Sequence, residues 1–315
     1  VVGTAASLSG GSANTAFGSH ASVSGGERNV ANGVYSSVGG GQNNEASDYA
    51  TVSGGELNAA EGDHSVVGGG QQNAASGYMS TVGGGESNKA SDHHAVVGGG
   101  WRNTAAGYVT SVAGGEWNLA SAYGSAISGG FQNYAGGYLS SIGGGERNAA
   151  TSYGSSVAGG LHNTAVGYVS VIAGGHDNRV ASAGTTISGG GNNFAFGFYA
   201  TIGGGWRNVA GTGASISGGD SNTAFGYHAT VSGGHGNLAN GYVASVGGGE
   251  NNQAGYYATV SGGEFNTALG YHAAIIGGRQ NVASSFMATV AGGEYNTASD
   301  HHAFVGGGWL NTASG

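Results

Sequence analysis

The chain has 315 residues, of which 72 are Gly and none is Pro or Cys, and its formal net charge is −9. The lack of Cys excludes a disulfide-stapled scaffold. Only 7 residues are Lys or Arg, against 16 Asp or Glu, which excludes the clustered positive charge that nucleic-acid binding needs. No apolar run approaches the roughly 18 residues of a membrane-spanning helix, so we expect no membrane contact by this segment.

One short repeat runs through the whole chain. An Asn recurs 21 times, and 17 of the 20 intervals are 15 residues long while the other three are 14. Two Gly stand four and three residues before each Asn, a Val, Ile or Leu stands six before it, and a small residue stands eight before it. Ala follows two residues after the Asn, with Val180 as the one exception. Such regular placement of aliphatic residues excludes a disordered chain.

Within each repeat the pattern predicts, in chain order, a short strand, a tight turn at the Gly pair, a second short strand and an opposite turn. Around Asn29 the two strands fall at 21–23 and 29–31. Residues two apart on a strand share a face, so the small residue, the aliphatic residue, the Asn and the Ala are predicted to point inward. The Gly pair suits a turn that needs positive φ or close backbone approach. The 14-residue intervals lose a residue near the opposite turn, which can absorb the deletion.

The predicted fold is all-β, a parallel β-solenoid of about 21 coils with 15-residue, occasionally 14-residue, repeats. A period of 15 is too short for helix-pair repeats. We expect residues 1–315 to be a single continuous repeat array, cut from a longer fibre protein. Coils stacked at about 4.8 Å would make a rod about 100 Å long. So thin a coil buries little apolar surface, which predicts association with identical chains.

The Asn row has a structural interpretation. Stacked amides can satisfy one another's polar atoms along a narrow interior, and we expect this role rather than ligand binding. The predicted ladder includes Asn29, Asn44, Asn58, Asn73, Asn88 and Asn103.

Two segments carry a resemblance to a known family. The runs Tyr49-Ala50-Thr51-Val52-Ser53-Gly54-Gly55 and Asn73-Ala74-Ala75-Ser76-Gly77-Tyr78 resemble the YadA-like head repeats of trimeric autotransporter adhesins. They resemble equally the repeat arrays of bacteriophage tail-fibre-like proteins. The resemblance implies a left-handed β-roll, three identical chains side by side, and surface attachment on a cell or virion, outside the cell. The adhesin repeat is typically one residue shorter, with a single Gly in its turn.

The two positions before the Asn vary most and hold every Trp of the chain. Trp has no room inside a coil of Ala and Val, so we expect these positions to form a decorated outer edge. Aromatic residues there suit contact with a host glycan or surface protein; packing against a neighbouring chain or turn is the alternative. The candidate contact residues are Trp101, Trp117, Phe131, Trp206 and Trp309. A second row, ten residues before the Asn, is rich in Tyr and is predicted to stack as a ladder or as a seam between chains.

We expect no catalytic residue, no cofactor and no metal site, because no His, Asp and Ser set stands out from the repeat. The runs Asp92-His93-His94 and Asp300-His301-His302 alternate between faces, which disfavours a shared ion within one chain. The predicted function is therefore a non-enzymatic structural and adhesive segment of an extracellular homotrimeric fibre. The alternatives are a phage or injection-device tail-fibre shaft and a stand-alone solenoid filament. We do not expect ice binding, because the outward Thr row is broken by Val66, Val96, Val171 and Phe304.

Overall fold

A computed structural model describes residues 3–314, which form 42 strands of two residues each and no helix. The predicted class, an all-β parallel β-solenoid with a repeat of about 15 residues, is confirmed. The chain divides into two compact units, Val1–Gly160 and Leu161–Gly315, which are described one at a time.

Each unit holds two parallel sheets, one of odd-numbered and one of even-numbered strands. The odd sheet of the first unit comprises β1 Ser7–Leu8, β3 Ser22–Val23, β5 Ser37–Val38, β7 Thr51–Val52, β9 Val66–Val67, β11 Thr81–Val82, β13 Val96–Val97, β15 Ser111–Val112, β17 Ala126–Ile127, β19 Ser141–Ile142 and β21 Ser156–Val157. Its even sheet comprises β2 Thr15–Ala16, β4 Val30–Ala31, β6 Glu45–Ala46, β8 Ala59–Ala60, β10 Ala74–Ala75, β12 Lys89–Ala90, β14 Thr104–Ala105, β16 Leu119–Ala120, β18 Tyr134–Ala135 and β20 Ala149–Ala150.

The second unit repeats this arrangement. Its even sheet comprises β22 Thr164–Ala165, β24 Arg179–Val180, β26 Phe194–Ala195, β28 Val209–Ala210, β30 Thr223–Ala224, β32 Leu238–Ala239, β34 Gln253–Ala254, β36 Thr267–Ala268, β38 Val282–Ala283, β40 Thr297–Ala298 and β42 Thr312–Ala313. Its odd sheet comprises β23 Val171–Ile172, β25 Thr186–Ile187, β27 Thr201–Ile202, β29 Ser215–Ile216, β31 Thr230–Val231, β33 Ser245–Val246, β35 Thr259–Val260, β37 Ala274–Ile275, β39 Thr289–Val290 and β41 Phe304–Val305.

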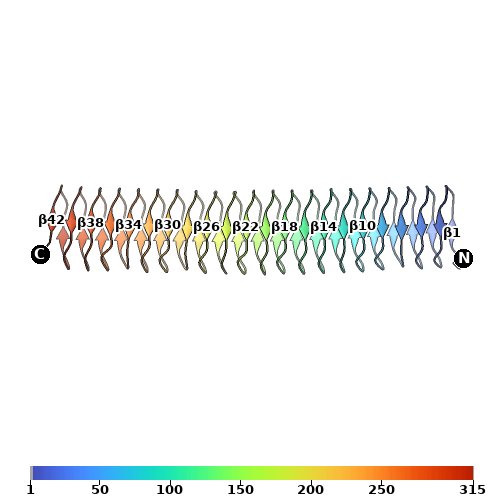
Figure 1. Cartoon of the computed structure of the whole chain (residues 1–315), viewed down its shortest axis with the longest axis horizontal. Coiled ribbons are helices and arrows are strands. Elements are labelled where there is room, and N and C mark those ends of the chain that lie inside the picture. The colour runs from blue at the N-terminus through green and yellow to red at the C-terminus, as the bar shows by residue number, and fades with distance from the viewer. Residues whose placement is uncertain (1–2, 315) are drawn as a thin grey trace. The chain divides into compact units, whose positions relative to one another are not determined.

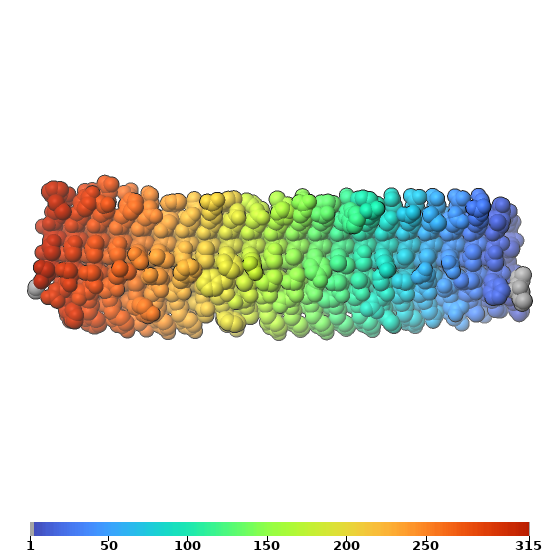
Figure 2. All heavy atoms as spheres, in the orientation of Figure 1, coloured from blue at the N-terminus to red at the C-terminus, as the bar shows by residue number. Residues whose placement is uncertain are grey.

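Equivalent residues of successive coils pair directly. Within each unit Figure 1 shows these strands side by side, and on the face drawn in Figure 2 the side chains of successive coils are in contact. In the odd sheet Ser22 pairs with Ser37, and in the even sheet Val30 pairs with Glu45. The pairing also holds across a 14-residue interval, where Ser37 faces Thr51. The shorter repeat thus leaves the register of both sheets intact.

A third ladder lies between the two sheets of each coil, at the position two residues before the Asn. There single residues form parallel bridges from coil to coil, such as Glu27 with Gln42 and Gln42 with Glu56. The sequence predicted this position only as part of a decorated edge after the Gly turn. Its backbone is in fact as regularly paired as the two sheets, which holds the coil on a third side.

The core is thin and consists of the four rows that the pattern placed inside. The coil of Asn29 illustrates them, because Ala21, Val23, Asn29 and Ala31 are all buried. The largest fully buried side chains are Ile and Val of the aliphatic row. Burying such a side chain contributes about 1.5–3 kcal/mol, so this row supplies most of the hydrophobic stabilisation of each coil. Leu8, in the first coil, is the exception and is exposed.

The second Gly of each pair is required by both its backbone and its neighbours. Gly115 has a φ of +88°, and a Cβ built on it would overlap the carbonyl oxygen of Gly130 in the next coil. Gly114, one residue earlier, has open space around the corresponding position. The pair is therefore made of two unequal residues, of which one is structurally obligatory.

Two other rows adopt a left-handed backbone although most of their residues are not Gly. These rows stand nine residues and one residue before the Asn, and together they include 37 non-Gly residues with positive φ. Such a conformation costs about 1–3 kcal/mol for an ordinary residue and persists where surrounding structure fixes it. Here the strained residues are fixed by bonds to the preceding coil, since Arg28 N donates to Ser12 O at 2.9 Å and Tyr35 N donates to Ser19 O at 2.8 Å.

We predict that Gly115→Ala destabilises the protein by about 3 kcal/mol or more, because Ala adds left-handed strain and a clash with the next coil. Gly114→Ala is the matched control and should change the free energy of unfolding by less than about 0.5 kcal/mol. Thermal unfolding followed by circular dichroism compares the two variants. Equal effects would contradict the assignment of unequal roles to the Gly pair.

Candidate functional site

The candidate contact residues lie on one edge of the coil. This decorated edge consists of the positions one and two residues before each Asn. Trp101, Phe131, Trp206 and Trp309 occupy the bridging position, and Trp117 occupies the left-handed position next to the Asn. Trp117, Trp206 and Trp309 are exposed, and Trp101 and Phe131 are half-buried.

The backbone beneath this edge is held by the Asn side chain. Asn103 Nδ2 donates to the carbonyl oxygens of Gly99, in its own turn, at 3.0 Å and of Gly115, in the next coil, at 2.7 Å. Its Oδ1 accepts a hydrogen bond from Asn118 N at 3.0 Å. Each amide therefore joins the Gly turn of its own coil to the backbone of the following one.

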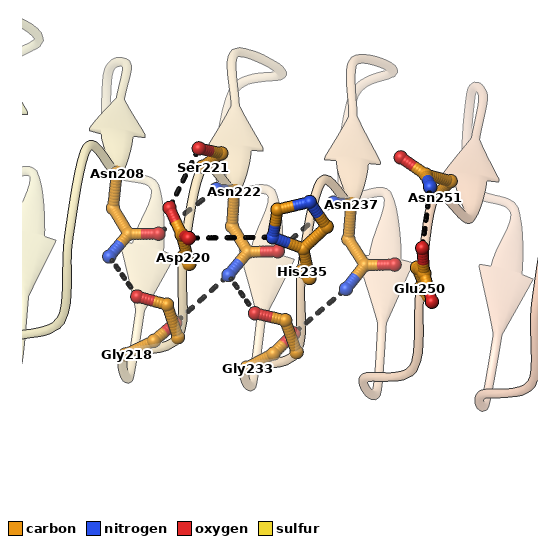
Figure 3. A network of polar contacts seen from close by, with 12 residues as sticks. Asn208, Gly218, Asp220, Ser221, Asn222, Gly233, His235, Asn237, Glu250 and Asn251 are labelled. Carbon is orange, nitrogen blue, oxygen red and sulfur yellow. Dashed lines mark hydrogen bonds and ion pairs between the residues drawn. The ribbon is translucent and has the colours of Figure 1, made fainter.

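The same network repeats in the second unit, as Figure 3 shows for three successive Asn residues. Asn222 Nδ2 donates to Gly218 O and Gly234 O, and its Oδ1 accepts from Asn237 N. Direct bonds from one amide to the next, which the sequence suggested, occur at a few coils, such as Asn118 Nδ2 to Asn103 Oδ1 at 3.1 Å. The backbone is the main partner because the Gly carbonyls lie nearer to the amide nitrogen.

The densest aromatic group on the edge is centred on Arg102. Its guanidinium lies 4.6 Å from the ring centroid of Trp101 and 4.6 Å from that of Trp117, so it contacts both indoles. The two indole rings are 5.5 Å apart and nearly perpendicular. We call Trp101, Arg102 and Trp117 the tryptophan cluster. Its long side chains restrain one another, so a ligand would meet a preformed surface at little entropic cost.

The next two coils extend this surface with polar groups. Arg147 Nε donates to Gln132 Oε1 at 2.8 Å, and its guanidinium lies 5.9 Å from the ring of Phe131. Arg147 Nη1 is also 3.3 Å from a carboxylate oxygen of Glu146. Aromatic faces, a planar cation and carboxylates are thus presented together on successive coils.

Most of the charge of the chain lies on the decorated edge. In the first unit the bridging row alternates carboxylates with neutral residues, since Glu27, Glu56, Glu86, Glu116 and Glu146 are separated by Gln42, Gln71, Trp101 and Phe131. This alternation doubles the distance between like charges. The ion pairs on this edge, such as Arg28 with Glu27 at 3.7 Å, are solvent-exposed and contribute at most about 1 kcal/mol each. Stability therefore does not account for this concentration of charge.

Trp206 has a local packing role. Its ring lies 5.0 Å from that of His176, two coils away, and the two rings cover the bridging position of Gly191 between them. A Cβ built on Gly191 would overlap both rings. Trp206 thus fills the space left by the missing side chain of Gly191 in the bridging row. Trp117 instead belongs to the tryptophan cluster. Trp309 is the most exposed Trp of the chain.

A row of stacked rings marks the opposite turn. Tyr108, Tyr123, Tyr138 and Tyr153 stack on successive coils, with centroids 5.3, 4.8 and 5.2 Å apart and planes within 8° of parallel. We call these four residues the tyrosine ladder. Sequence reasoning anticipated the stacking but missed the part that His plays. His20 stacks on Tyr35 and Tyr49 stacks on His64, all one residue closer to the Asn than the row first considered.

Two titratable groups near this turn have shifted pKa values. His93 donates its backbone N–H and offers its ring to Asp92, which lowers the pKa of that carboxyl group. Partial burial, together with Tyr271 and Tyr242, raises the pKa of the Tyr257 phenol. Among residues 3–314, no group of three or more His, Cys, Asp or Glu is placed to hold a metal ion. An open groove is lined by Glu264, Arg279, Glu294 and the neighbouring Gly residues.

No family model matches this sequence, and a search of curated proteins finds no match. Across the described residues, no helix is long and apolar enough to cross a membrane.

We predict that Asn103→Ala lowers the free energy of unfolding by about 3 kcal/mol or more, because it removes three hydrogen bonds and leaves the N–H of the buried Asn118 without a partner. Asn240→Ala is the control, since Asn240 is exposed and makes no side-chain hydrogen bond. Chemical denaturation measures both variants. A loss at Asn103 no greater than that at Asn240 would show that the ladder is dispensable.

Proposed function

We propose that this chain is a non-enzymatic structural and adhesive segment of an extracellular homotrimeric fibre, and that the tryptophan cluster is its contact with a host glycan or surface protein. The observation that carries the proposal is the mutual contact of Arg102 with two Trp rings on an outer edge. These large residues lie outside the thin core, so they add little to the stability of the fold. Ligand binding accounts for their presence on the surface.

The chemistry of the edge suits a long, polar ligand. Indole rings offer flat apolar faces, and the neighbouring Glu and Arg side chains offer hydrogen-bond acceptors and donors at each coil. Trp, Tyr and Arg are the residues most enriched at binding hot spots. The cluster lies on an open surface, which favours contact with an extended polysaccharide or a protein surface over enclosure of a small substrate.

Association of identical chains is supported by the thin core and by the distribution of charge. The decorated edge carries an excess of carboxylates and would repel a copy of itself. We therefore place the contact between chains away from the tryptophan cluster, which stays accessible to a ligand.

Light scattering of the purified chain should give three chain masses in one particle. Apolar surface that a single thin coil cannot bury is the reason for this expectation. A stable, folded monomer would overturn the homotrimer and favour a stand-alone solenoid.

Trp117→Ala should weaken binding by at least about tenfold, as expected for a hot-spot residue. The binding measured is that to a glycan identified on an array or to a host surface protein. Trp117 has a left-handed backbone that Ala shares at similar cost, so the fold is preserved. Tyr134→Ala is the matched control, because Tyr134 is a similarly exposed aromatic residue on the even sheet. If both variants bind like the original chain, the tryptophan cluster is not the contact.

A further inference from the structure

The tyrosine ladder brings several exposed phenols into direct contact along one side of the coils. Its four phenols belong to one unit, stand on consecutive coils and lie almost parallel, with centroid separations from 4.8 to 5.3 Å. These are offset-stacked rings, an arrangement that aromatic pairs favour, and here it recurs over four successive coils. Each ring remains more than 40% exposed, so its phenol reaches solvent.

The fold fixes this spacing from below. The ladder residues Tyr108 and Tyr138 directly follow Gly107 and Gly137, whose Cα atoms lie against the backbone of the next coil. The rings are therefore held at the pitch of the parallel strands, about 4.8 Å. Exposed rings also rotate on a picosecond to nanosecond scale, so the carbons ortho to the phenol oxygens of neighbouring rings meet frequently.

We propose that the tyrosine ladder is a site of oxidative cross-linking, at which neighbouring coils of one chain become joined through dityrosine. The co-reactant is hydrogen peroxide, used by a haem peroxidase. Each of two neighbouring phenols gives up one electron and its phenolic proton. The two phenoxyl radicals form a carbon–carbon bond between ortho positions, which leaves a ketone on each ring. Each ortho hydrogen is then lost as a proton and the ketone oxygen gains one, which restores both phenols. Two tyrosines and one peroxide give one dityrosine and two water molecules.

The product would join coils covalently on the side opposite the Asn ladder. A coil held only by hydrogen bonds can open locally, and local opening is how proteases and denaturants enter a solenoid. A bond between successive coils closes that route in a chain that has no Cys and hence no disulfide. The inference is independent of the adhesive role proposed above.

The molecule contains its own comparison set. Tyr227 and Tyr242 are stacked within 12° at 5.4 Å, whereas Tyr257 and Tyr271 are just as close, at 5.2 Å, but tilted by 59°. Tyr199 is the most exposed Tyr, at 74%, and no aromatic ring lies against it among the described residues. If access to the oxidant controls the reaction, Tyr199 should react most. If contact between rings controls it, the tyrosine ladder should react most.

The test treats the purified chain with a haem peroxidase and hydrogen peroxide, followed by a denaturing gel and mass spectrometry of protease digests. We expect dityrosine fluorescence in the band of a single chain, and peptides joining Tyr108 to Tyr123, Tyr123 to Tyr138 and Tyr138 to Tyr153. Cross-links at the tilted pair should be at least fivefold fewer. Met79 and Met287 are exposed, so their conversion to sulfoxide measures direct oxidation by peroxide. This background is thereby distinguished from the coupling of tyrosines.

Tyr123→Phe keeps the ring, and so the stack, but removes the phenol in the middle of the ladder. This variant should lose the first two cross-links completely and keep the one between Tyr138 and Tyr153. Tyr199→Phe is the control and should leave all three unchanged. Chains joined to one another, absence of dityrosine, or cross-links at Tyr199 as frequent as those in the ladder would each overturn the proposal.

Discussion

The buried Asn amide governs the architecture of both units. Its two donor hydrogens are taken by Gly carbonyls of its own coil and of the next, and its oxygen receives the backbone N–H of the next Asn. A hydrocarbon of the same size would leave the N–H of the next, buried Asn unpaired, which costs about 1–3 kcal/mol, and would also remove the two bonds to Gly carbonyls. The row is polar because the coil is too thin to keep its backbone away from its core.

That dependence explains why the fold tolerates so much strained backbone. Two non-Gly positions in most coils have left-handed φ, a conformation that a short peptide would avoid. Strained residues beyond the first coil are bonded to the preceding coil, as Arg28 is to Ser12, so the conformation is fixed by the stack rather than by local preference. An isolated coil would have the strain without the bonds. Stability therefore belongs to neighbouring coils together, as in other repeat proteins.

The sequence predicted the fold well because the spacing of residues within the repeat indicates which of them lie on strands and which on turns. The inward rows, such as Val23 and Ala31, follow from two-residue spacing, and the turn at Gly115 follows from an invariant Gly pair in every repeat. It did not predict the third ladder, because residues such as Glu27 and Trp101 share no chemistry that marks a paired backbone. The left-handed positions were equally hidden, since Val109 and Trp117 are residues that avoid this conformation elsewhere.

The candidate site was predictable in place but not in detail. Trp is too large for a core of Ala and Val, so its outward position follows from volume. The contact of Arg102 with two indoles depends on side chains from neighbouring coils, and one sequence gives no sign of which partners will meet. The packing of Trp206 over Gly191 was also missed, although an absent side chain in an otherwise occupied row is a signal that could have revealed it.

The 14-residue repeats have a consequence for how such a protein can change over generations. A missing residue is absorbed in one turn, and pairing on either side continues, as between Ser37 and Thr51. Errors of copying that alter a repeat by one residue at this turn are therefore tolerated, while the paired rows keep their phase. A whole coil can likewise be gained or lost without disturbing its neighbours, because every coil presents the same two surfaces to the stack. Length and surface decoration can then be inherited as separate traits.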